Sequence, residues 1–320
     1  MVLKGVARLL APSGPQARLS ILIFHRVLPA LDPLFPGEQY ASRFDEMLRW
    51  VGRWFRVLPL DEAVARLADG TLPSRPAAIT FDDGYADNAT QALPLLQRHG
   101  MSATFFIATS FLNGGRMWND SVIESVRLCD KVSLDLRDAG LGLHPLGSIA
   151  QRQAAIESLI GQIKYLDADA RLDAVARVER QAGVRLPTNL MMTDTQVRQL
   201  RDAGMQIGAH TCNHPILARL PDAAARQEIM DGKAALESIV AAPVSLFAYP
   251  NGKPSKDYLA AHTRMVKEAG FSAAVSTAHG VSTSASDLYQ LPRFTPWNRS
   301  RTRFGFSLLA NLRHVRSEVV

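Results

Sequence analysis

Cysteine is scarce in this chain of 320 residues, in which Cys129 and Cys212 are the only two. That number excludes a disulfide-stabilised scaffold and a metal site built from cysteines alone. No apolar run approaches the roughly 18 residues that span a bilayer. Pro12, Gly14 and Pro15 interrupt the segment where a signal peptide would need its apolar core. Because hydrophobic residues make up 47% and charged residues 21%, we expect a folded, soluble protein of the cytoplasm.

Acidic residues are nearly absent from the C-terminal segment, although the whole chain has a net charge of only +6. From residue 293 onward Glu318 is the single acid. The basic residues there are Arg293, Arg299, Arg301, Arg303, Arg313 and Arg316. An apolar stripe at helical spacing lies among them, formed by Phe304, Leu308, Leu312 and Val315. Two interpretations stay open: the stripe packs onto the folded domain, or segment 296–320 is a basic amphipathic tail attracted to an anionic membrane or a phosphate-bearing substrate.

Short apolar segments alternate with longer helical patterns along most of the chain. The strands that these patterns predict cover residues 19–24, 77–81, 103–108, 206–210, 244–249 and 272–276. Three predicted helices, 89–99, 194–203 and 256–269, each end just before a glycine that supplies a left-handed cap, and a strand pattern follows each. Repeated helix–glycine–strand units predict a parallel α/β architecture.

Residues from about 118 to 190 interrupt this alternation. Segments 149–165 and 168–181 are amphipathic and rich in Ala, Gln and Arg, which predicts two helices. We interpret the region as a helical insertion within one α/β domain of residues 19–295, which an N-terminal segment of residues 1–18 precedes. Trp118 begins the insertion and is a candidate platform for a sugar ring, with buried packing as the equal alternative.

The first chemically informative cluster follows the strand predicted over 77–81. There an apolar strand runs directly into Asp82, Asp83 and Gly84. The C-terminal ends of strands face the active site in parallel sheets and barrels. Because adjacent carboxylates repel, keeping both ionised requires a cation or a shared proton. The alternative is a solvated Asp-Gly turn without a function.

The second cluster, His210-Thr211-Cys212-Asn213-His214, follows another predicted strand. Two histidines four residues apart can converge on one metal ion from a helix or a tight loop. Cys212 is either a third ligand or a spacer between them. A zinc ion held by one carboxylate and two imidazoles would keep an open position for water, which is typical of a catalytic site. Co²⁺, Ni²⁺ and Fe²⁺ suit the same ligands.

The third cluster is Phe247-Ala248-Tyr249-Pro250-Asn251-Gly252. A strand that ends in a Pro-Asn-Gly turn accounts for it in structural terms. The functional interpretation is the wall of a substrate groove, formed by Tyr249 and Pro250, in which the Tyr249 backbone N–H faces the reacting oxygen.

These three clusters, in this order, resemble the polysaccharide deacetylases with NodB homology (carbohydrate esterase family 4), over roughly residues 19–295. The resemblance implies a distorted (β/α) barrel and an enzyme that removes acetyl groups from sugar polymers. It also implies that Asp82 is the catalytic base and that Asp83, His210 and His214 bind the divalent metal. We therefore expect a hydrolase of N-acetyl groups in a polysaccharide or lipid-linked glycan, with a place in exopolysaccharide biosynthesis at the inner face of the membrane.

Two departures from the family pattern concern the acid and the arginine of the site. No Leu-x-His motif follows Tyr249, but the first strand ends at His25, which resembles the biofilm poly-N-acetylglucosamine deacetylases, whose catalytic histidine lies on the N-terminal strand. His25 is therefore the candidate general acid, and a hydrogen-bonded strand-end histidine is the alternative. Ala248 stands where the family has an arginine that orients its catalytic aspartate. Arg293, otherwise a substrate-binding candidate, could take that role, with Arg26 as the weaker choice.

Two other functions remain open. A metal hydrolase of the same fold could cleave a small-molecule amide or imide, or an inactive barrel could bind glycans without cleaving them. An intact cluster of two aspartates and two histidines argues against the inactive barrel, because binding alone requires no such charge cluster. Nucleic acid is not an expected partner, since the basic residues gather in one tail without a recognised motif.

Overall fold

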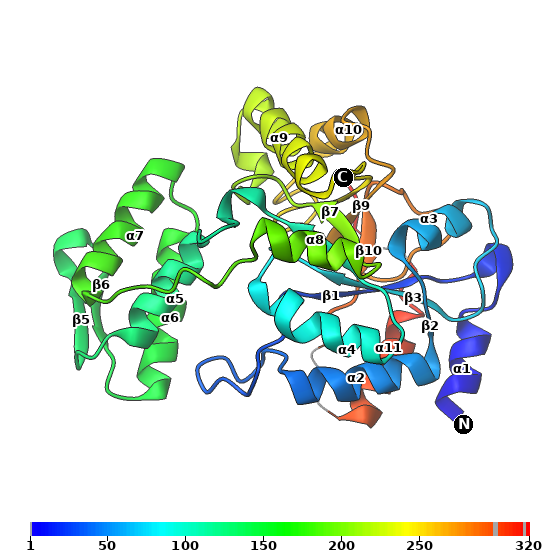
Figure 1. The fold of residues 1–320 in the computed structure, drawn as a ribbon, viewed down its shortest axis with the longest axis horizontal. Helices are drawn as coiled ribbons and strands as arrows, with labels where there is room; N and C mark the ends of the chain where they lie inside the picture. The colour runs from blue at the N-terminus through cyan, green and yellow to red at the C-terminus, as the bar shows by residue number, and fades with distance from the viewer. Residues whose placement is uncertain (1, 297–299, 316–317) are drawn as a thin grey trace.

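Residues 2–296, 300–315 and 318–320 are described by a computed structural model of the chain (Figure 1). Two of the C-terminal arginines, Arg299 and Arg316, lie outside these residues. Eight parallel strands form the centre: β1 (Ser20–Phe24), β2 (Arg56–Val57), β3 (Pro76–Phe81), β4 (Thr104–Ile107), β7 (Gln206–Ala209), β8 (Leu246–Ala248), β9 (Ala273–His279) and β10 (Leu291–Arg293). They run in the order β1-β3-β4-β7-β8-β9-β10, and β2 pairs with the start of β3.

The sheet closes on itself through Phe294, which follows β10. Its N–H donates to the Ile21 carbonyl at 2.7 Å, and its carbonyl accepts from the Ile23 N–H at 3.1 Å. Strands β1 and β3 are buried along their whole length, as expected where a parallel sheet is covered on both faces. The result is a distorted (β/α) barrel, which confirms the fold class expected from the family resemblance.

Helices surround this barrel on its outside (Figure 1). They are α1 (Val2–Leu10), α2 (Ala41–Trp54), α3 (Leu60–Ala68), α4 (Leu93–Arg98, after a π-helical turn at Asn88–Ala92), α8 (Asp194–Asp202), α9 (Asp222–Val240), α10 (Ala260–Glu268) and α11 (Arg301–Asn311). Short 3-10 turns lie at Gly14–Gln16, Thr109–Phe111, Arg137–Ala139 and Leu217–Arg219. None of the helices in the described ranges combines the length and the hydropathy needed to cross a membrane.

All six predicted strands are present, within two or three residues of their expected ends. Strands β2 and β10 were not predicted, because strands of two and three residues are too short to show an alternating pattern. The helix predicted over 256–269 begins only at Ala260. Helix α1 was also missed, in the segment expected to precede the domain.

The insertion forms a lobe beside the barrel (Figure 1). It contains α5 (Trp118–Leu128), α6 (Ile149–Ile163) and α7 (Ala168–Ala182), together with an antiparallel hairpin of β5 (Ser133–Leu136) and β6 (Gly142–Pro145) that the sequence did not indicate. The lobe has an apolar core of its own, which includes Val126, Leu134 and Leu159.

The C-terminal stripe packs onto the barrel. Phe304 and Leu308 of α11 and Leu312 directly after it are buried, whereas Val315 is 37% exposed. The Phe304 ring lies 5.9 Å from the Trp50 ring and 6.1 Å from the Trp54 ring. Three of the four residues of the stripe are therefore occupied within the protein, as in the first of the two interpretations, and attraction of the segment to a membrane stays a prediction.

Candidate active site

The strand ends deliver the candidate residues to one edge of the barrel. Asp82 and Asp83 directly follow β3, His210 follows β7, and His25 follows β1. All these strands are parallel, so their carboxyl ends lie at the same end of the barrel.

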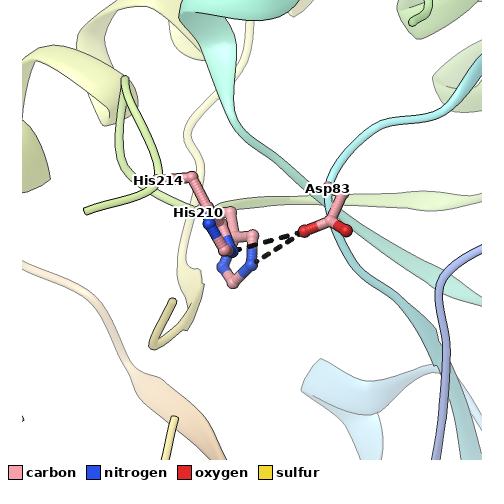
Figure 2. A group of neighbouring side chains, drawn as sticks. All are labelled: Asp83, His210 and His214. Carbon is pink, nitrogen blue, oxygen red and sulfur yellow. Dashed lines mark ion pairs between the residues drawn. The ribbon is translucent and has the colours of Figure 1, made fainter. Parts of the chain in front are cut away.

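Asp83, His210 and His214 form a possible metal site (Figure 2). The Asp83 Oδ1 atom lies 3.5 Å from His210 Nε2 and 3.4 Å from His214 Nε2, and the three ligand atoms lie within 4.8 Å of one another. Two ligands of a tetrahedral zinc ion lie about 3.3 Å apart, because each zinc–nitrogen bond measures about 2.0–2.1 Å. The group therefore needs only small side-chain movements to hold such a cation. Cys212 is not part of it, which favours the interpretation of this residue as a spacer.

The Ala248 carbonyl orients His210 and burial keeps His214 neutral, while the Asp83 and Asp82 carboxylates outweigh burial and raise the pKa of His210. His210 Nδ1 lies 2.8 Å from the Ala248 carbonyl, to which it can only donate, so that Nε2 is left as the free nitrogen toward Asp83. Burial is the largest influence on His214 and lowers its pKa to about 4. His214 is therefore neutral at pH 7, the state in which an imidazole binds a metal.

Left-handed backbone conformations concentrate at this site. Asp83, Thr211 and His214 have φ angles of 77°, 63° and 51°, in a region that residues other than glycine rarely adopt. Such conformations cost about 1–3 kcal/mol each and are kept where the surrounding contacts determine them. Gly232 of α9 provides one such contact, because a Cβ atom there would lie 2.8 Å from the Thr211 carbonyl carbon. Helix α9 therefore packs against and supports the histidine loop, residues 210–214.

Glu228 of α9 also holds the histidine loop, and no signal in the sequence singled it out. Its Oε2 accepts hydrogen bonds from the Cys212 N–H at 3.0 Å and the Asn213 N–H at 2.8 Å, and its Oε1 accepts from the Asn213 side chain at 2.7 Å. Glu228 thereby fixes the two residues between the histidines, so it acts as a positioning residue for both imidazoles.

Replacing Glu228 by alanine is expected to weaken zinc binding about tenfold, because loss of a group that positions metal ligands typically costs 10- to 100-fold. The dissociation constant is measured by competition with a chromogenic chelator. Asp231→Ala on the exposed face of the same helix is the matched control and should leave affinity unchanged. Equal affinities of Glu228→Ala and the wild type would contradict the positioning role.

Asp82 is buried and makes a bidentate ion pair with Arg293. Both distances are 2.7 Å, from Nη1 to Oδ1 and from Nη2 to Oδ2, while Arg293 Nε donates to the Ser276 carbonyl. Burial raises the pKa of Asp82, but the charge and hydrogen bonds of Arg293 together with the nearby His210 and His25 outweigh that effect, and the pKa is lowered overall. Arg26 instead pairs with Asp87 at 2.8 Å. Of the two candidate arginines, Arg293 is therefore the one that contacts Asp82.

Two cavities meet at Asp83. One has a volume of about 200 Å³ and is lined by Asp83, His214, Trp118 and Asn251 among others. The other, of about 290 Å³, is lined by Asp83, His25 and residues that include Glu38 and Asp120. His25 is exposed at the end of β1, so its side chain can reach a ligand in the cleft. Trp118 is half-buried and faces the same cleft from the lobe.

Three expected substrate contacts are corrected by the structure. The Tyr249 N–H donates to the Val275 carbonyl at 3.2 Å, because it belongs to the ladder between β8 and β9, so it does not face a reacting oxygen. Pro250 is buried and lines neither cavity, whereas Asn251 lines the smaller one. Arg293, with 2% of its surface exposed, is too deeply buried to contact a substrate directly.

A buried acid that the sequence did not reveal lies beside Asp83. Asp120 accepts a hydrogen bond from the Tyr85 hydroxyl at 3.1 Å. Burial is the main cause that raises the pKa of Asp120 to about 7. This carboxyl group is therefore partly protonated at neutral pH and adds less negative charge to the cleft than its residue type implies.

Comparison with known proteins identifies the relatives of this chain. The family described as polysaccharide deacetylase matches residues 69–131 and 172–274, which include Asp82, Asp83, His210 and His214. YxkH of Bacillus subtilis (strain 168), whose name assigns it to the polysaccharide deacetylases, is 21% identical over 279 residues, which cover 87% of this chain and 71% of YxkH.

Solved structures share the fold. The Streptococcus pyogenes deacetylase PplD, in complex with acetate, superposes with a TM-score of 0.61 at 18% identity, over 92% of this chain and 98% of PplD. IcaB from Ammonifex degensii gives a TM-score of 0.58 at 17% identity, over 94% of this chain and 98% of IcaB.

Proposed function

Because the chain belongs to the polysaccharide deacetylase family, whose members are hydrolases of carbon–nitrogen bonds other than peptide bonds, we propose that it removes N-acetyl groups from amino sugars of a polysaccharide or a lipid-linked glycan. The observation that carries this proposal is the convergence of Asp83, His210 and His214 next to the buried pair of Asp82 and Arg293, with Asp83 and His214 lining a cavity of about 200 Å³.

The donor set suits a divalent cation, with Zn²⁺ as the first choice. One carboxylate and two imidazoles, one of them oriented by a backbone carbonyl, match the ligands of catalytic zinc sites. When bound, the cation would act as a Lewis acid that lowers the pKa of water and polarises the acetyl carbonyl.

Asp82 and His25 then divide the proton transfers. Asp82 is ionised and adjacent to Asp83, so it accepts the proton of the attacking water. An amide nitrogen leaves poorly as an anion, so it must be protonated as the carbon–nitrogen bond breaks. His25 supplies that proton from the other side of the cleft, which releases acetate and a free amine. Asn251, whose N–H has no acceptor among the described residues, replaces Tyr249 as the candidate donor to the oxyanion.

Acetate release from N-acetylated chito-oligosaccharides tests the proposal. We expect turnover that a chelator reduces at least about 100-fold and that added Zn²⁺ restores. Small amides and cyclic imides, assayed in parallel, should be poor substrates. Turnover confined to these small molecules would instead identify a small-molecule hydrolase, and glycan binding without acetate release would identify an inactive binding protein.

A further inference from the structure

The inserted lobe contributes two cations to the smaller cavity. Lys164 directly follows α6 and Arg171 lies in α7, and both are half-buried and line this cavity together with Asp83 and His214. The Arg171 guanidinium also lies 5.8 Å from the centre of the Trp118 ring. The proposed deacetylation does not use either cation.

Further positive charge surrounds these two residues. Lys164, Arg219 and Lys256 all approach the Tyr165 ring, at 5.9, 5.2 and 5.6 Å from its centre. None of these three cations makes an ion pair within the described parts of the chain, and neither does Arg171. The Asp167 carboxylate acts on Arg171 through space, but it caps α7 by accepting from the Ala170 N–H at 2.9 Å. Gathered like charges repel, so a bound anion would stabilise this region.

The larger cavity has the opposite character. Its two arginines are neutralised, Arg127 by Asp32 at 2.7 Å and Arg26 by Asp87 at 2.8 Å. It also contains the carboxyl group of Glu38, which makes no ion pair among the described residues. A negative group on a substrate therefore finds unpaired lysine and arginine charges on the lobe side of Asp83, whereas both arginines that line the larger cavity are already paired.

We infer that Lys164 and Arg171 form a subsite for an anionic group, a phosphate or a carboxylate, that is covalently linked to the N-acetylated glycan. This inference rests on the proposed function and specifies its substrate class. Guanidinium and ammonium groups recognise phosphate and carboxylate oxygens through charge-assisted hydrogen bonds. Because one cavity is lined by both cations and by two candidate metal ligands, the anion belongs to the acetylated sugar or to its neighbour.

Three oligosaccharides test the subsite. They are neutral, fully N-acetylated chitotriose, the same N-acetylated chitotriose with a terminal phosphate, and a tetrasaccharide of alternating N-acetylglucosamine and glucuronate. We expect the wild-type kcat/KM for at least one anionic substrate to exceed that for chitotriose about tenfold or more. Preference for the phosphate or for the uronate identifies the source of the negative charge. Lys164→Gln and Arg171→Gln should each lower this preference about tenfold, and Lys164→Glu should reverse it.

Arg180→Gln, an exposed charge removal on the same helix α7, is the matched control and should keep the wild-type preference. A wild-type preference for anionic substrates below twofold would overturn the subsite. The subsite would also be overturned if Lys164→Gln and Arg171→Gln kept the wild-type preference. If none of the three sugars releases acetate, the proposed function fails. Calorimetric binding of the same sugars then decides the subsite separately, since equal affinities for neutral and anionic forms would overturn it.

Discussion

Replacing Asp82 by asparagine is expected to reduce deacetylation about 1,000-fold while zinc affinity changes little. An asparagine cannot accept a proton, and loss of a general base typically costs 10²- to 10⁴-fold in rate. The metal ligands remain because Asp83, His210 and His214 are separate side chains. Turnover is measured by acetate release, and metal content by competition with a chelator.

The Asp82→Asn variant should be assayed at a temperature where circular dichroism shows it to be folded, because it leaves the Arg293 charge buried without its partner. Asp138→Asn, an exposed change in the lobe, is the matched control and should keep full activity. An Asp82→Asn enzyme that binds zinc and still turns over at the wild-type rate would show that Asp82 is not the base.

Replacing Arg293 by methionine is expected to lower the free energy of unfolding by about 3–5 kcal/mol, the usual cost of breaking a buried ion pair from one side. The side chains of Arg293 and Asp82 are 0% and 3% exposed, so water cannot take the place of the lost partner. Urea unfolding measures the change. The double variant Asp82→Asn, Arg293→Met should be destabilised by less than the sum of the two single changes, because neither charge is then left unpaired.

The single variant Arg293→Met should also change how turnover depends on pH. In the wild type the pKa of Asp82 is lowered on folding, so the pair contributes stability above the ordinary pKa of about 3.9, which is lost as the pH falls through the lower folded value. Without Arg293, burial would raise the pKa of Asp82. The acid limb of the kcat profile should therefore move to higher pH, and an unchanged limb would contradict control of Asp82 by Arg293.

Much of the architecture and the metal-ligand candidates could be read from the sequence because they are local. Each of the six predicted strands is a short apolar run, and Asp83, His210 and His214 each follow such a strand within a few residues. Parallel strands end at one edge, which places these residues on the same side of the barrel, and the resemblance to the polysaccharide deacetylases implied that the three side chains meet around one metal. Their catalytic roles remain proposals that the experiments above test.

Tertiary structure decided the contacts that depend on distant pairing. Arg293 reaches Asp82 across 211 residues only because the barrel closes through Phe294, and Glu228 reaches the histidine loop from a separate helix. The Tyr249 N–H donates to the Val275 carbonyl because β8 pairs with β9. Lys164 lines the cleft because of the way the lobe packs. Hydrogen-bond register and the docking of packed elements are set by the whole fold. The sequence could therefore name Arg293 as a candidate partner of Asp82, but it could not establish that contact or indicate the positions of Glu228 and Lys164.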